Sequence, residues 1–135
     1  MIGTVIMIDV DDLERAVDFY ERGLGLRLAR RLFENTVAEM AGAQTPIQLS
    51  LKEAGSPWSP RTAERRDYRR HWTPVHLDFV VDDVKTAVQQ AKAAGATVET
   101  EIETFTWGLL ATLSDPFGNG FCLVRLVGRG YGEVE

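Results

Sequence analysis

The residues most capable of chemistry are few: a histidine, an aspartate and the only cysteine. His76 and Asp78 lie two residues apart in the run His76–Val81, which has the composition of a buried strand, so their side chains share one strand face. The other face is apolar, with Leu77, Phe79 and Val81. A buried histidine and aspartate are costly unless they pair, join a hydrogen-bond network or serve a cleft. We therefore predict that both face a cleft; the alternative is a half-buried histidine with no role.

Cys122 lies in a second strand-like run, Phe121–Leu126. A thiolate can act as a nucleophile or a metal ligand, but a cysteine on a strand is more often a small core hydrophobe. The sequence offers no activating base beyond His76. A single cysteine also excludes an intrachain disulfide and a multi-cysteine zinc cluster.

The alternation of side chains extends this argument to other strands. One phase of each predicted strand is apolar and suits a helix-covered face: Ile6, Ile8, Ile47, Leu49, Phe121 and Leu123. The opposite phase must then line the concave side, and we predict a cleft that contains Met7, Gln48, His76, Asp78 and Cys122 and holds no metal as isolated. Trp107, at the start of a strand, is a further candidate for stacking on a ligand. It is equally well interpreted as a rim residue packed on the linker or on a second subunit.

Two copies of one strand–helix pattern position these residues. The run Val5–Val10 predicts a strand, Asp11 and Asp12 offer helix caps, and Leu13, Ala16, Val17, Tyr20 and Leu24 then recur at helical spacing. Shifted by 71 positions, the pattern returns from His76 onwards, with Asp82 and Asp83 at the caps and Val84, Ala87, Val88 and Ala91 on the helix. The sequence therefore predicts an internal duplication.

Short extended segments follow each helix. The predicted strands are 26–33, 36–40 and 47–52 in the first half, and 97–103, 109–114 and 121–126 in the second. We expect an α+β fold of eight strands and two helices. The single domain of residues 1–135 would comprise a first module (1–53), a linker (54–73), a second module (74–127) and a poorly packed tail (128–135). The linker contains an arginine run from Arg61 to Arg70. This run predicts a loop that is solvated or lies between subunits, or alternatively a loop that binds an anionic ligand.

Composition excludes several functions. With 15 basic and 20 acidic side chains the net charge is −5, which does not suit general nucleic-acid binding. No apolar run approaches membrane-spanning length, and the first residues lack the basic region of a signal peptide. We expect a cytoplasmic protein. Trp58 and Trp72 lie outside either module, and large apolar residues there predict a homodimer interface.

Three motifs resemble the vicinal oxygen chelate superfamily, which includes glyoxalase I, extradiol dioxygenases, and fosfomycin and bleomycin resistance proteins. They are residues 12–26 (DLERAVDFYERGLGL), residues 76–84 (HLDFVVDDV) and residues 115–123 (DPFGNGFCL). The resemblance implies paired βαβββ modules, each with a curved mixed sheet around a cleft. Its enzymes hold a metal with four ligands, one on the first and one on the last strand of each half.

The four ligand positions of the superfamily fall here on Val5, Gln48, His76 and Cys122. Valine cannot bind a metal, and no carboxylate remains in the set. The resemblance therefore favours a metal-free cleft that binds a small organic molecule, as bleomycin resistance proteins sequester a drug. One alternative is a metal-dependent or cofactor-independent lyase, isomerase or dioxygenase-like enzyme with a non-standard site, including a residual Gln48–His76–Cys122 zinc site. Another is a structural or regulatory domain with a vestigial cleft.

Overall fold

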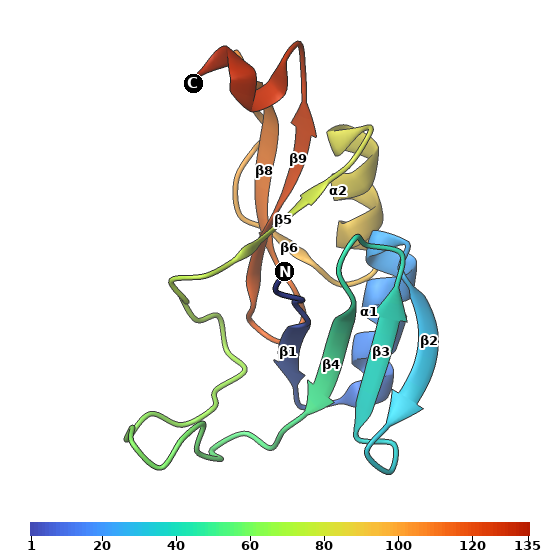
Figure 1. Ribbon diagram of the computed structural model, residues 1–135, viewed down its shortest axis with the longest axis vertical. Coiled ribbons are helices and arrows are strands. Elements are labelled where there is room, and N and C mark those ends of the chain that lie inside the picture. The colour runs from blue at the N-terminus through green and yellow to red at the C-terminus, as the bar shows by residue number, and fades with distance from the viewer. The chain divides into compact units, whose positions relative to one another are not determined.

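The computed structural model describes residues 1–135, and the chain divides into two compact units, Met1–Arg69 and Arg70–Glu135. Each unit contains one sheet and one α-helix packed against that sheet (Figure 1). The predicted α+β class with two mixed sheets is confirmed. The boundaries predicted for modules, linker and tail stay a prediction.

The first unit has a four-stranded sheet with strand order β1-β4-β3-β2. Its elements are β1 (Ile6–Val10), α1 (Leu13–Leu24), β2 (Arg27–Leu32), β3 (Val37–Ala41) and β4 (Ile47–Leu51). β1 pairs with β4 in parallel, and the other neighbours are antiparallel. The first strand of the unit therefore lies beside its last strand.

Helix α1 begins and ends where its sequence predicts. The Asp12 carboxylate accepts a hydrogen bond from the Arg15 amide at 3.0 Å, which satisfies one of the free donors of the first turn. Gly25 follows the helix with a φ of 72°, a left-handed conformation that glycine adopts without strain. The face toward the sheet is buried: Leu13, Ala16, Val17, Phe19 and Tyr20.

The second unit repeats this arrangement with strand order β5-β9-β8-β6, and β7 also pairs with β8. Its elements are β5 (Leu77–Val80), α2 (Val84–Ala93), β6 (Thr97–Val98), β7 (Glu103–Phe105), β8 (Gly108–Ser114), β9 (Gly120–Leu126) and the short 3-10 helix η1 (Gly130–Glu133). β5 and β9 are parallel, as β1 and β4 are. The Asp83 carboxylate caps α2 by accepting from the Thr86 amide at 3.1 Å. Val84 and Ala91 are buried beneath α2, whereas Val88 is only half-buried.

One expectation about the second unit was wrong. The strand predicted over 97–103 is divided into β6 and β7, so the chain has nine strands instead of eight. The amides of Glu99 and Thr100 both donate to the Thr112 carbonyl, which breaks the regular ladder there. The tail forms η1 and places Tyr131 against Trp107, while most of its residues are exposed.

None of the helices combines the length and apolar composition that a membrane span requires.

Candidate ligand pocket

Three of the predicted cleft residues meet on the second sheet. Asp78 of β5 pairs in register with Cys122 of β9, and His76 lies two residues before Asp78. His76 Nε2 is 3.2 Å from Asp78 Oδ1, and these side chains are 56% and 37% exposed. The ligating atoms of all three residues lie within 4.8 Å of one another. The sheet register therefore brings together an imidazole, a carboxylate and a thiol, as their common strand face predicts.

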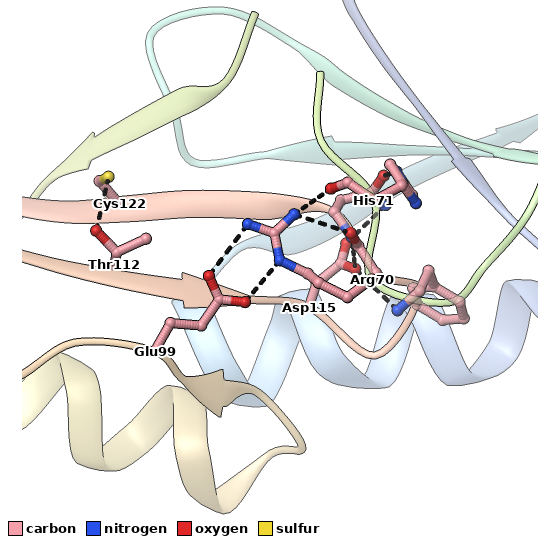
Figure 2. Close-up of polar contacts among 9 residues, drawn as sticks. Arg70, His71, Glu99, Thr112, Asp115 and Cys122 are labelled. Atoms are coloured by element: carbon pink, nitrogen blue, oxygen red, sulfur yellow. Dashed lines mark hydrogen bonds and ion pairs between the residues drawn. The ribbon is translucent and has the colours of Figure 1, made fainter. Parts of the chain in front are cut away.

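Cys122 is the buried member of this group. Its Sγ lies 3.7 Å from Thr112 Oγ1 on β8, the contact drawn in Figure 2. Burial raises the pKa of the Cys122 thiol; the Thr112 hydrogen bond opposes this shift, and the nearby Asp78 charge adds to it. The thiol is thus protonated at neutral pH, which argues against a preformed thiolate nucleophile.

A pocket of about 240 Å³ opens beside these residues. Its walls come from β8, β9 and the segment that leads into β5: Arg70, Trp72, Thr73, His76, Thr112, Gly120, Phe121 and Cys122. Trp72 is 80% exposed, so its indole presents a large apolar surface to solvent. Pockets for drug-sized ligands usually measure about 300–1,000 Å³, so this one suits a smaller molecule or one part of a larger molecule.

Arg70 holds one wall of the pocket in place. Its guanidinium binds both carboxylate oxygens of Glu99, with Nε–Oε2 at 2.6 Å and Nη2–Oε1 at 3.1 Å. Its Nη1 also donates to the carbonyl of His71 and, at 3.4 Å, to that of Gly118. The Arg70 hydrogen bonds lower the pKa of Glu99. Figure 2 shows the Arg70 guanidinium turned toward Glu99, so its charge is neutralised within the protein.

Gly120 makes the position of Arg70 possible. A Cβ atom at Gly120 would lie 2.6 Å from Arg70 Nη2, closer than such atoms approach. The guanidinium therefore lies directly over the backbone at the start of β9.

The turn between β8 and β9 also anchors the segment that leads into β5. Asp115, only 4% exposed, accepts from the amides of Phe117 at 2.8 Å and Asn119 at 3.0 Å. The Asn119 side chain donates to Asp115 Oδ2 and accepts from His71 Nε2 at 2.9 Å. The His71 amide donates to the Gly118 carbonyl at 3.2 Å. These bonds fix residues 70–71 against the turn and so position the chain that runs on to His76.

In the first unit the structure brings together Met7 and Gln48. They are register partners on β1 and β4, and Met7 is half-exposed. The Gln48 amide donates to Glu39 Oε2 at 2.8 Å, and Glu39 also binds Arg30. The hydrogen bonds from Arg30 and then Gln48 lower the pKa of Glu39. Gln48 is thus tied into a polar row across the sheet.

Trp107 lies apart from the pocket lining. Its ring stacks on Phe105 with centroids 5.2 Å apart and planes 8° apart, and it also contacts Tyr131. Contact of Trp107 with a ligand stays a prediction. Trp72, four residues before His76, was open in the sequence between stacking on a ligand and packing at an interface, and the structure places it in the pocket lining.

Three arginines of the linker run form ion pairs. Arg66 binds Asp9 at 2.6 Å, Arg69 binds Asp67 at 2.6 Å, and Arg70 binds Glu99. These pairs favour a structural role for the three arginines over a grip on an anionic ligand.

The side chains at the four ligand positions of the resembled superfamily do not fit its metal. Val5 offers no donor and the Gln48 amide is bound to Glu39, so His76 and Cys122 are the donors that remain, too few for the metal of the superfamily.

Comparisons with known proteins agree on one family. Residues 5–124 match the model of a glyoxalase-like domain. No curated protein matches the chain significantly. A glyoxalase/bleomycin resistance protein/dioxygenase family enzyme from Burkholderia phytofirmans PsJN superimposes with a TM-score of 0.72 at 21% identity, covering 91% of this chain and 97% of that chain.

Two further structures are somewhat more similar in sequence. A member of the glyoxalase/bleomycin resistance protein/dioxygenase superfamily from Sphaerobacter thermophilus DSM 20745 is 27% identical, with a TM-score of 0.67 and coverage of 93% of this chain and 97% of that chain. TnmS3, an antibiotic binding protein from Streptomyces sp. CB03234, is 25% identical, with a TM-score of 0.66 and coverage of 93% and 96%.

Proposed function

Since this chain belongs to the glyoxalase-like domain family, and so to the vicinal oxygen chelate superfamily that its three motifs resemble, we propose that it binds a small organic molecule without a metal. The observation that carries the proposal is the pocket of about 240 Å³ lined by Trp72, His76 and Cys122. The structurally similar protein TnmS3 is an antibiotic binding protein, which supports a binding role for this chain.

The pocket walls indicate the chemistry of the ligand. Trp72 and Phe121 provide aromatic surface, while Thr112 and His76 provide hydrogen-bonding groups. Arg70 is neutralised by Glu99, and Asp78 adds a carboxylate beside His76. These features favour a planar, neutral or cationic molecule over an anion.

Titration calorimetry in the presence of a chelator tests this function, with metal-free bleomycin and a panel of neutral and cationic aromatic compounds as probes. Replacing Trp72 or His76 by alanine should weaken binding roughly tenfold or more, because each removes one pocket wall. Trp58→Ala is the matched control, since Trp58 is also exposed but does not line the pocket. Absence of binding by the whole panel, or equal effects of Trp58→Ala and Trp72→Ala, would count against the proposal.

A cofactor-independent lyase or isomerase is the second candidate. The 3.2 Å contact between His76 and Asp78 favours it, since a carboxylate that orients an imidazole makes a usable general base. The test is whether solvent deuterium is incorporated into a bound carbonyl compound. Incorporation by the wild type that is lost in His76→Ala and in Asp78→Asn would favour this enzyme over the binding protein.

We also propose that the ligand contacts Met7, Gln48 and Asp78. We further propose that the protein forms a homodimer and is located in the cytoplasm. Exposed tryptophans support the dimer, because Trp58 is 74% exposed outside both sheets.

A further inference from the structure

We propose that the hairpin of β7 and β8 is a docking surface for an extended, basic segment of another protein. That segment would pair with the free edge of β7 and place its cationic side chains against Glu103, Phe105 and Trp107. The surface lies within the second unit and includes no residue of the pocket lining. It does not depend on the pocket binding an organic molecule, so the two proposals can fail separately.

Strand β7 lies at an edge of the second sheet. It pairs with β8 alone, and its three residues, Glu103, Thr104 and Phe105, are all exposed. A strand that is paired on one side presents backbone amide and carbonyl groups on its other side, and an added strand can pair with them. Glu101 and Ile102, which precede β7, are also exposed and lengthen the edge that a partner could reach.

Aromatic side chains gather where this edge ends. The rings of Phe105 and Trp107 are stacked with centroids 5.2 Å apart, and the centroids of Trp107 and Tyr131 are 5.3 Å apart. Phe105 is 40% exposed and Tyr131 is 52% exposed, so part of the ring surface is open to solvent. The faces of aromatic rings attract guanidinium and ammonium groups. The cluster therefore favours a partner with arginine or lysine side chains.

The charges beside the rings favour the same partner. Glu103 shares a strand face with Phe105, and neither Glu101 nor Glu103 forms an ion pair. Arg129 of the tail is paired with Glu133. Unpaired glutamates attract a basic segment and repel the same edge of a second copy. The charge therefore selects a basic partner over pairing of β7 with itself.

The aromatic surface is formed before a partner arrives. The Val127 amide donates to the Trp107 carbonyl at 2.9 Å, which ties the turn of the hairpin to the end of β9. Tyr131 of η1 supports the Trp107 ring from the tail. A partner would thus lose little free energy in ordering these side chains.

Titration calorimetry with synthetic peptides tests the surface. The basic probe is a hexapeptide of alternating arginine and threonine, blocked at both ends, and the acidic probe has glutamate in place of arginine. We expect one basic peptide to bind per chain and the acidic peptide not to bind. The basic peptide with every backbone amide N-methylated should bind at least about tenfold more weakly, because it has no donors for the edge of β7.

Three variants test the residues of the surface. Glu103→Gln and Phe105→Ala should each weaken binding of the basic peptide about tenfold, and Trp107→Leu should weaken it at least as much. Glu103→Gln changes only the charge of an exposed side chain, so it keeps the test valid if Trp107→Leu does not fold.

Glu34→Gln and Phe33→Ala are the matched controls, because both residues are exposed on the turn between β2 and β3, away from β7. They should leave the peptide affinity unchanged, as should Trp72→Ala in the pocket.

Failure of the wild type to bind the basic peptide, or equal losses in Glu34→Gln and Glu103→Gln, would overturn the proposal. Equal binding of the acidic or the N-methylated peptide would overturn it as well. A loss in Trp72→Ala as large as in Trp107→Leu would assign the peptide to the pocket and would also overturn it.

Discussion

Asp115 shows how much one buried carboxylate contributes to the pocket wall. It accepts from two backbone amides and from the Asn119 side chain inside the turn between β8 and β9. Asp115→Ala should lower the free energy of unfolding by about 2–3 kcal/mol, because the buried donors lose a charged acceptor. Urea denaturation measures this, and Asp82→Ala, a change at an exposed aspartate, should have little effect.

Cys122 should react slowly with alkylating reagents. Its pKa is raised by burial, so the reactive thiolate is scarce at pH 7 and becomes more abundant only as the pH rises through that pKa. We expect iodoacetamide to label the native protein far more slowly than the unfolded chain, as followed by mass spectrometry. Rapid labelling of the native protein at pH 7 would contradict this assignment and favour the nucleophile hypothesis.

Individual site residues differ in how far the sequence could predict them. The sequence could predict His76, Asp78 and Cys122 as site residues, because two-residue alternation decides which strand face a side chain occupies. Their proximity depends on the register Asp78–Cys122, which alternation alone does not specify. Trp72 and Arg70 lie outside any periodic segment, so only the structure shows that they line the pocket.

At the scale of elements, the cap of α2 gives a pH-dependent test. Hydrogen bonds from the backbone and side chain of Thr86 lower the pKa of Asp83. Its stabilising effect is therefore present above the unfolded-state pKa, near 3.8, and is lost as the pH falls through the lower native pKa. Asp83→Ala should be less stable than the wild type at pH 7, and the difference in thermal unfolding midpoint should disappear in strong acid.

The Arg70–Glu99 pair should control the mobility of the segment before β5. Arg70→Gln removes the ion pair and the contact with the Gly118 carbonyl, so residues 71–76 should become easier to cleave. Limited proteolysis should show faster cutting in this segment, and Gly120→Ala should act in the same direction by displacing the guanidinium. Arg69→Gln is the matched control, because the Arg69–Asp67 ion pair joins residues only two apart. Equal cleavage rates in Arg70→Gln and Arg69→Gln would contradict the anchoring role.

Elements with two agreeing signals were predictable from sequence. Both α-helices combine an aspartate cap with an apolar stripe, and both begin within one residue of the expected position. The division into β6 and β7 was not predictable. Alternation continues through residues 97–103, and the break depends on two amides that share the Thr112 carbonyl, a contact distant in sequence.

For the whole molecule, we predict a homodimer. Trp58→Arg should shift the protein toward a monomer in sedimentation experiments at micromolar concentration, because a charge replaces an exposed indole in the proposed interface. Phe33→Arg, which changes another exposed aromatic residue on the turn between β2 and β3, is the control. A wild-type protein that sediments as a monomer at high micromolar concentration would contradict the prediction.

The parallel pairing of first and last strands has a consequence for biosynthesis. β1 can pair only after β4 has been translated, and β5 only after β9, so each unit closes its sheet through a long loop late in its own synthesis. Since each unit holds its strand partners within itself, the first can complete its hydrogen-bond ladder while the second is still being made. We therefore expect the duplicated chain to fold vectorially, in two closure steps that follow the order of translation.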